Sequence, residues 1–171
     1  MTVHSFRILH VIQGEHRTSD QPDTVLTTVL GSCVAACLYD PARRIGGMNH
    51  FLLPDDLGTR DLRYASAAME VLVNSLIKEG ALRMRLEAKL FGGGRMLAGL
   101  PDIGRRNADA AIAFLHSEGI KLQAQSLGGT FARRVRFWPT TGKAQQILLH
   151  ASQDVAQRTP SQPAAGTIEL F

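Results

Sequence analysis

The feature that most constrains this chain is a pair of apolar segments joined by a tight turn. The first segment covers residues 27–40 and the second covers residues 45–54. Asp40-Pro41-Ala42-Arg43 lies at the junction, and a proline at the second of four positions is typical of a β-turn. We therefore expect two antiparallel strands that form a hairpin.

The turn also predicts which side chains meet across the hairpin. If Asp40 faces Arg43, then Cys33 faces His50 on the same side of the sheet, with Cβ atoms about 4.5–5.5 Å apart. That distance suits a nucleophilic thiol and its base. A slip of one residue would move the two side chains to opposite faces.

Cys33 follows Gly31-Ser32, a tight turn that would leave backbone N–H groups free beside the sulfur. We interpret it as a nucleophile; the alternative is a buried structural cysteine. Cys37 has no turn beside it and is expected to pack in the core. The two cysteines are too far apart along one strand to form a disulfide, so both should be reduced.

His50 would act as the base, although a histidine hydrogen-bonded into the core would give the same pattern. Thr27 could offer its hydroxyl to the second ring nitrogen of His50, or could simply be a good strand former. A zinc site formed by Cys33, Cys37 and His50 would lack an obvious fourth ligand. No metal or organic cofactor is expected.

The remaining pattern predicts an α+β fold with mixed or antiparallel sheets. The segment 15–23 reads as a loop. A buried strand is expected over 6–13, further strands over 25–30, 86–94, 120–126, around 135–137 and over 144–149, and helices over 61–79 and from Asn107 to Gly119. Residues 1–152 should form one domain. Residues 153–171 read as a flexible tail, whose apolar end, 168–171, is either mere end sequence or a short docking motif.

Composition narrows the class of protein. The 171 residues are 44% hydrophobic and 20% charged, which is ordinary for a globular domain. Apolar runs are too short to enter a membrane and no signal peptide is evident, so a cytoplasmic location is expected. The net charge of +4 favours an acidic partner. No nucleic-acid-binding signature appears, and nucleic acid is not an expected partner.

Several spaced blocks of sequence closely resemble the chemoreceptor glutamine deamidases of the CheD family. The first two are residues 30–40 and 46–54, which contain Cys33 and His50. The others are residues 89–94, 103–107, 128–129, 133–137 and 141–142. The resemblance covers roughly residues 6–149. Ala132 departs from the family pattern where a glycine is expected, as does Gly94 where alanine is common.

The resemblance implies a cysteine hydrolase that converts selected glutamines of chemoreceptor cytoplasmic helices to glutamate. It implies a sandwich of sheets with helices outside, as in the cytotoxic necrotizing factor toxins. Carried over by position, Cys33 is the nucleophile, His50 the base and Thr27 the residue that orients His50, with backbone N–H groups of Ser32 and Cys33 at the oxyanion. A CheC-type response-regulator phosphatase is an implied partner. The alternatives are a non-catalytic adaptor, or amide or ester chemistry on another substrate.

Overall fold

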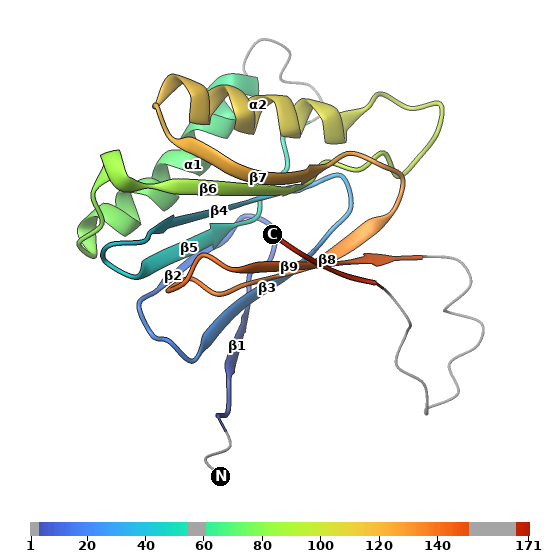
Figure 1. Cartoon of the computed structure of the whole chain (residues 1–171). Helices are drawn as coiled ribbons and strands as arrows, with labels where there is room; N and C mark the ends of the chain where they lie inside the picture. The colour runs from blue at the N-terminus through green and yellow to red at the C-terminus, as the bar shows by residue number, and fades with distance from the viewer. Residues whose placement is uncertain (1–3, 55–60, 151–166) are drawn as a thin grey trace.

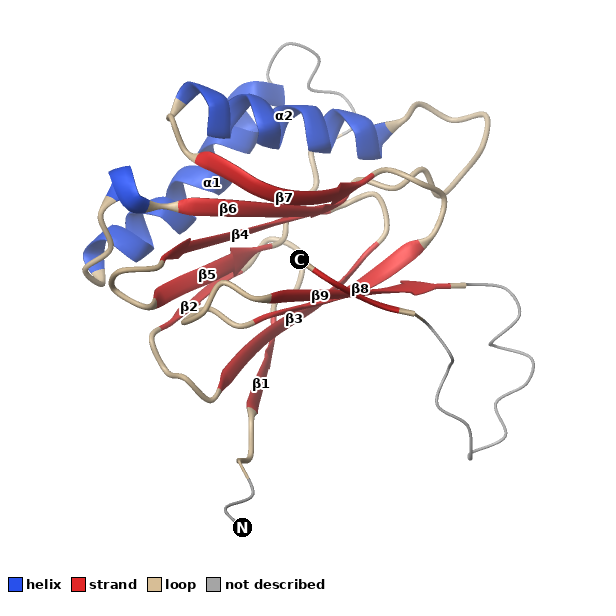
Figure 2. Cartoon of the chain, viewed as in Figure 1, coloured by secondary structure: helices blue, strands red, loops and turns tan. Residues whose placement is uncertain are grey.

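The two strands of the expected hairpin lie in the middle layer of a three-layer molecule (Figure 1). The computed structural model describes residues 4–54, 61–150 and 167–171. Within these residues there are two five-stranded sheets, with helices on one side only (Figure 2). The expected α+β sandwich with helices outside is confirmed.

The first sheet has the strand order β1-β3-β8-β9-β10 and the second has the order β2-β5-β4-β6-β7. The strands of the first sheet are β1 (Arg7–His10), β3 (Thr24–Leu30), β8 (Ala132–Phe137), β9 (Ala144–Leu149) and β10 (Ile168–Leu170). Those of the second are β2 (His16–Ser19), β5 (Ile45–Asn49), β4 (Val34–Asp40), β6 (Glu87–Gly92) and β7 (Lys121–Leu127). The helices are α1 (Asp61–Lys78) and α2 (Ile103–Ser117), with a short 3-10 turn at Arg83–Arg85.

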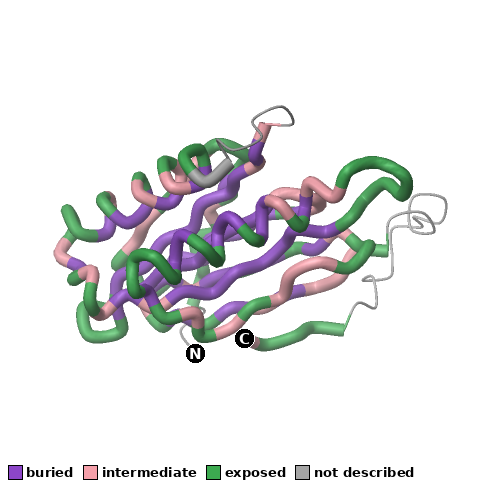
Figure 3. Tube along the Cα trace, turned by 90° about the horizontal axis from the view of Figure 1, so that it is seen from above, coloured by how far each residue is buried: buried purple, intermediate pink, exposed green. Residues whose placement is uncertain are grey.

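Strand β4 is buried on both faces because it lies between two separate cores. Val34, Ala36 and Leu38 pack with the helices, whereas Ala35 and Cys37 pack against the first sheet. The helices turn exposed faces outward and buried faces toward the sheet (Figure 3). The expected core position of Cys37 is confirmed, and both cysteines are free thiols.

Helix α1 agrees closely with the expected span, and Gly80 just beyond it has a left-handed φ of 107°. Helix α2 begins earlier than expected. Asp102 is its N-cap, with its side chain accepting a hydrogen bond from the N–H of Arg105. Asn107 therefore lies inside the helix, where it is fully buried. This change of position gives Asn107 a different role, described below.

Two expectations for the N-terminal region were wrong. The strand expected over 6–13 is the edge strand β1, which is mostly exposed, with Ile8 49% accessible. The loop expected over 15–23 contains β2, which pairs antiparallel with β5. The side chains of β2 are polar, so its sequence shows no strand pattern. The strand forms because its backbone hydrogen bonds to β5 stabilise it.

The expected flexible tail is wrong for its last residues. Ile168–Leu170 forms β10, which pairs antiparallel with β9. The Phe171 ring packs edge-on against Phe91, with centroids 5.3 Å apart. The rest of the expected tail, over 153–166, lies outside the described residues.

Candidate functional site

The hairpin register differs by two residues from the one expected. Asp40 pairs with Ile45, not with Arg43. The Asp40 carboxylate accepts hydrogen bonds from the N–H groups of Ala42 and Arg43, which holds a four-residue loop over 41–44. Arg44 closes this loop with a left-handed φ of 52°.

A shift of two residues keeps Cys33 and His50 on one face but makes them diagonal neighbours. Val34 pairs with Phe51 through two backbone hydrogen bonds of 2.9 and 3.0 Å. Cys33 precedes Val34 and His50 precedes Phe51 in sequence. Because the two strands run in opposite directions, Cys33 and His50 lie on opposite sides of this pair. In a regular ladder, diagonal neighbours lie about 7–8 Å apart, with their Cβ atoms somewhat closer, so the direct opposition expected from the turn was wrong.

The backbone around the cysteine is held by its carbonyl groups. The carbonyl oxygens of Gly31 and Cys33 accept hydrogen bonds from the N–H groups of Gly94 and Gly93, at 3.0 and 2.8 Å. The carbonyl of Ser32 accepts one from the Asn107 side chain at 2.8 Å. With three successive carbonyls bound, the loop over 31–33 has little freedom to change its conformation.

Two residues from other elements shape this loop. Gly92 has a φ of 107°, and a Cβ there would overlap the Cys33 carbonyl oxygen, so only glycine fits. Asn107 donates to Ser32 and also accepts a 2.8 Å hydrogen bond from the N–H of Leu53. Asn107 thus ties the loop that carries Cys33 to the segment that follows His50.

The hydrogen bonds of His50 fix its tautomer. Nδ1 lies 2.8 Å from Thr28 Oγ1 and 3.3 Å from the carbonyl oxygen of Val11. The Thr28 hydroxyl donates its only proton to that same carbonyl at 2.6 Å, so it can only accept from the ring. Nδ1 therefore carries the proton and Nε2 holds a lone pair.

The free nitrogen of His50 is buried and has no hydrogen-bond partner in the described structure. Burial lowers the pKa of His50, and the hydrogen bond with Val11 offsets part of this shift. The imidazole is thus neutral around pH 7. A buried nitrogen with an unused lone pair is suited to accept a proton during a reaction.

Thr27, the expected orienting residue, does not contact His50. Its hydroxyl donates instead to the carbonyl oxygen of Val135 at 2.8 Å. Alternation along β3 puts Thr28 on the face shared with Leu26 and Leu30, which pack against the second sheet. Thr27 lies on the other face, so the assignment was wrong by one residue.

The Cys33 thiol is half-buried, and its hydrogen-bond partner is Gln13, whose Oε1 lies 3.7 Å from Sγ. Burial raises the pKa of Cys33, while its own backbone N–H acts in the opposite direction. The thiol is therefore protonated at rest. The thiol and the His50 imidazole are not hydrogen-bonded to each other, since Nε2 has no partner among the described residues.

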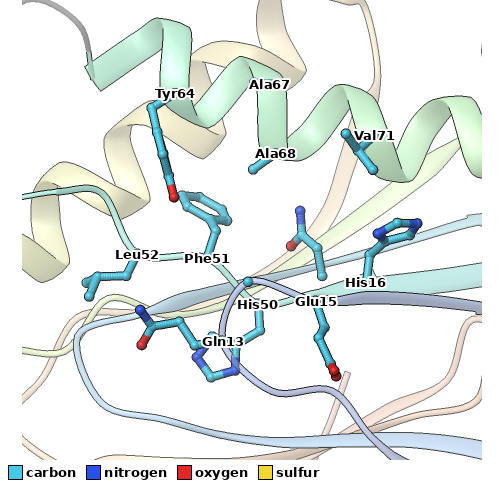
Figure 4. Close-up of a pocket in the computed structure, with 12 residues that line it drawn as sticks. Gln13, Glu15, His16, His50, Phe51, Leu52, Tyr64, Ala67, Ala68 and Val71 are labelled. Atoms are coloured by element: carbon cyan, nitrogen blue, oxygen red, sulfur yellow. The ribbon is translucent and has the colours of Figure 1, made fainter.

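A cleft of about 350 Å³ opens beside His50 between the loop over 13–16 and helix α1 (Figure 4). Gln13 and His50 both line it. The other lining residues are Gly14, Glu15, His16, Asn49, Phe51, Leu52, Tyr64, Ala67, Ala68 and Val71. Its size and mixed lining suit a single side chain with part of its backbone.

The sequence reasoning missed Gln13, Thr28 and Asn107 as members of the site. Strict alternation from Leu26 would have identified Thr28. No local signal identifies Gln13 or Asn107, because their contacts join segments distant in sequence. Among the described residues, no three His, Cys, Asp or Glu side chains gather closely enough to hold a metal ion.

No helix in the described part of the chain is both long and apolar enough to cross a bilayer.

Among solved structures, the crystal structure of Bacillus licheniformis hypothetical protein YfiH matches 72% of this chain and 60% of its own chain, with 17% identity and a TM-score of 0.44.

Comparison with known proteins identifies the family. Residues 52–146 match the family model described as CheD chemotactic sensory transduction. A probable chemoreceptor glutamine deamidase CheD of Acidiphilium cryptum (strain JF-5) is 49% identical, over 96% of this chain and 94% of the relative. The protein of the same name from Caulobacter vibrioides (strain NA1000 / CB15N) is 51% identical, over 95% of this chain and 92% of the relative. That from Rhizobium meliloti (strain 1021) is 46% identical, over 96% of this chain and 96% of the relative. This chain belongs to the CheD family.

Proposed function

We propose that this protein hydrolyses the side-chain amide of glutamines in chemoreceptor cytoplasmic helices, leaving glutamate and releasing ammonia. The observation that carries the proposal is the thiol of Cys33 on a fixed backbone loop, diagonal to an imidazole whose free nitrogen is a buried base. Family membership supports the same reaction, because the relatives carry the name of glutamine deamidases. We place the reaction in the cytoplasm.

In the proposed first half-reaction, the Cys33 side chain turns from Gln13 toward His50. Nε2 of His50 removes the thiol proton, and the sulfur attacks the glutamine Cδ. The electron pair of the carbonyl moves to oxygen, and backbone N–H groups of Ser32 and Cys33 donate to that oxyanion. The imidazolium then gives its proton to the amide nitrogen, and the C–N bond breaks. Ammonia departs, and the acyl group remains on Cys33 as a thioester.

In the second half-reaction, His50 Nε2 removes a proton from water and the resulting hydroxide attacks the thioester carbonyl. The C–S bond breaks, the carbonyl re-forms as a carboxylic acid, and the thiolate recovers its proton. Thr28 holds His50 in the required tautomer throughout. All atoms and protons balance with water as the only co-substrate.

The surface next to the loop over 31–33 is suited to bind a protein partner. Met96, Leu97 and Leu100 are 39%, 63% and 53% exposed and line a groove that includes Ser32. We assign this surface to protein partners, namely the receptor helices and, as a second binding partner, the CheC-type response-regulator phosphatase. Large exposed apolar side chains grouped on one surface support such docking.

Mass spectrometry tests the proposal. Purified protein is incubated with receptor cytoplasmic fragments, and the receptor peptides are examined for the mass gain of Gln-to-Glu conversion. We expect conversion with the wild type, and none with Cys33→Ala or His50→Ala. If the wild type binds the fragments but their mass does not change, the protein is an adaptor.

A further inference from the structure

Gln13 contacts the nucleophile but has no role in the chemical steps proposed above. Its carboxamide is hydrogen-bonded to Cys33 Sγ at 3.7 Å and faces the cleft that His50 also lines (Figure 4). Gln13 is exposed, so its contact with the thiol does not result from core packing. A polar group held beside a reacting sulfur needs a chemical explanation.

The loop that carries Gln13 is fixed to the chain around His50. The N–H of Gly14 donates to the carbonyl of His50 at 2.8 Å, and the N–H of His50 donates to the carbonyl of Glu15 at 3.1 Å. The N–H of Glu15 donates to the carbonyl of Ile12 at 3.0 Å, which closes a tight turn over 12–15. The backbone at Gln13 is therefore anchored to the catalytic base.

The reaction requires hydrogen-bond donors near the sulfur. Once sulfur has attacked, the oxyanion lies two bonds from Sγ, and an effective donor must lie about 2.7–3.1 Å from that oxygen. Such a donor is necessarily in the immediate neighbourhood of the sulfur, where the Gln13 carboxamide lies. The backbone N–H groups of Ser32 and Cys33 are the main-chain donors proposed above, and a side-chain donor from Gln13 would add to them at the same oxygen.

The carboxamide can serve both states of the reaction. With a protonated thiol, Oε1 accepts from Sγ–H, as observed. Rotation by 180° about the Cγ–Cδ bond exchanges Oε1 for Nε2, which has two protons to donate. The same group can therefore accept from the resting thiol and donate to the negative charge that develops later.

We propose that Gln13 is a further catalytic residue, whose side-chain Nε2–H donates to the oxyanion of both tetrahedral intermediates. As the S–C bond forms and the carbonyl electron pair moves to oxygen, Nε2–H of Gln13 donates to that oxygen together with the backbone N–H groups of Ser32 and Cys33. When the C–N bond breaks, and again when the C–S bond breaks, the carbonyl re-forms and the donors are released. This inference rests on the proposed function.

The test compares two reactions of the same sulfur. Deamidation of receptor fragments passes through an oxyanion, whereas alkylation of Cys33 by iodoacetamide is a direct displacement at carbon and does not. The variants are Gln13→Ala and Gln13→Glu. The Gln13→Glu side chain has nearly the same size as glutamine but cannot donate a hydrogen bond when ionised. Gln123→Ala, at an exposed position of β7, is the matched control.

We expect Gln13→Ala to lower kcat about 100- to 1,000-fold, as loss of one oxyanion donor does, with KM changed little. Gln13→Glu should be at least as impaired, because its carboxylate repels the oxyanion. Alkylation of Cys33 in Gln13→Ala should match the wild type, and Gln123→Ala should deamidate normally. Thermal unfolding of each variant checks that the fold is retained.

Two results would overturn the inference while leaving the proposed function intact. In one, Gln13→Ala deamidates at the wild-type rate. In the other, deamidation and alkylation fall by the same factor, which would mean that Gln13 only holds the thiol. If the wild type itself shows no deamidation that depends on Cys33, the proposed function fails and the inference is withdrawn with it.

Discussion

At the scale of single residues, two hydrogen-bond acceptors around Nδ1 of His50 determine the protonation state of the second ring nitrogen, Nε2. Thr28 Oγ1 and the Val11 carbonyl both face Nδ1, so the proton stays there and Nε2 remains a base. A side chain one position earlier, at Thr27, cannot do this because it points to the opposite face of β3.

Replacing the two threonines separately tests this assignment. Thr28→Val removes the hydroxyl that holds His50, and kcat/KM should fall about tenfold, since one buried hydrogen bond contributes about 1.5 kcal/mol. Thr27→Val removes only a contact to Val135 and should keep near-normal activity. Steady-state kinetics of both variants provides the measurement. The reverse order of effects would restore Thr27 as the orienting residue.

The pH dependence follows from the lowered pKa of His50. The imidazole is active as a base only when neutral, so kcat/KM should fall as the pH drops through that pKa. Because burial lowers this pKa, the acid limb should lie below the ordinary histidine value of about 6.5. A pH–rate profile measures it directly. An acid limb above neutrality would mean that His50 is stabilised in its charged form.

The raised pKa of Cys33 gives a separate expectation on the alkaline side. Iodoacetamide reacts with the thiolate, so alkylation should increase with pH through a midpoint above the ordinary cysteine value of about 8.5. A midpoint well below this would indicate a resting thiolate–imidazolium pair, and the proton transfer in the first half-reaction would then be unnecessary.

At the scale of elements, helix α2 helps to position a site to which it contributes no reacting group. Asn107 uses both ends of its amide, one on Ser32 and one on Leu53. Both ends of the amide are bonded, so no smaller or singly polar side chain can replace it without leaving a buried group unpaired.

Substitutions at Asn107 should therefore affect stability and activity together. Asn107→Asp keeps the acceptor for Leu53 but loses the donor to Ser32, and should lower the free energy of unfolding by about 1–3 kcal/mol. We expect kcat to fall more than KM rises, because the distance between Cys33 and His50 changes. Denaturant unfolding and kinetics measure the two effects. Normal kcat in a destabilised variant would limit Asn107 to the fold.

At the scale of the whole molecule, the last residues of the described chain help to join the two sheets. Lys89 of β6 donates from Nζ to the carbonyl oxygens of Gly142 and Phe171, at 2.6 and 2.8 Å. Phe171 also packs against Phe91 in the core between the sheets. The segment 168–171 is thus a structural part of the sandwich.

Phe171→Ala should lower the free energy of unfolding by about 1–3 kcal/mol, because it removes an aromatic contact from the core between the sheets. Ile168→Ala is the matched control: Ile168 lies three residues before Phe171, on β10, but is 55% exposed, so its effect should stay within about 0.5 kcal/mol. Chemical denaturation measures both variants. Equal effects would mean that the segment contributes no core contact.

The net charge of +4 also acts on the whole molecule. If it steers the protein toward acidic receptor helices, the association rate should fall as ionic strength rises. Stopped-flow or surface-binding measurements at several salt concentrations would test this, with dissociation rates as the internal comparison. An association rate independent of salt would exclude steering.

Much of the fold could be predicted from the sequence because its signals are local. Helix α1 follows from apolar residues at helical spacing and from Gly80 at its end, and the hairpin follows from its turn. The edge strand β2 and the C-terminal strand β10 could not be predicted. Strand β2 has no apolar pattern, and the apolar residues of β10 are too few to indicate a strand. Each is stabilised by backbone hydrogen bonds to a strand distant in sequence.

By itself the sequence determined which chemical groups were available: a thiol after Gly31-Ser32, an imidazole across a hairpin and two adjacent hydroxyls. Only the tertiary structure decided how they meet. The Asp40 loop set the register two residues away from the one expected, and the packing of the first sheet on the second brought Thr28 to His50. Side-chain type is a property of one position, whereas register and facing depend on hydrogen bonds between distant segments, which no local pattern records.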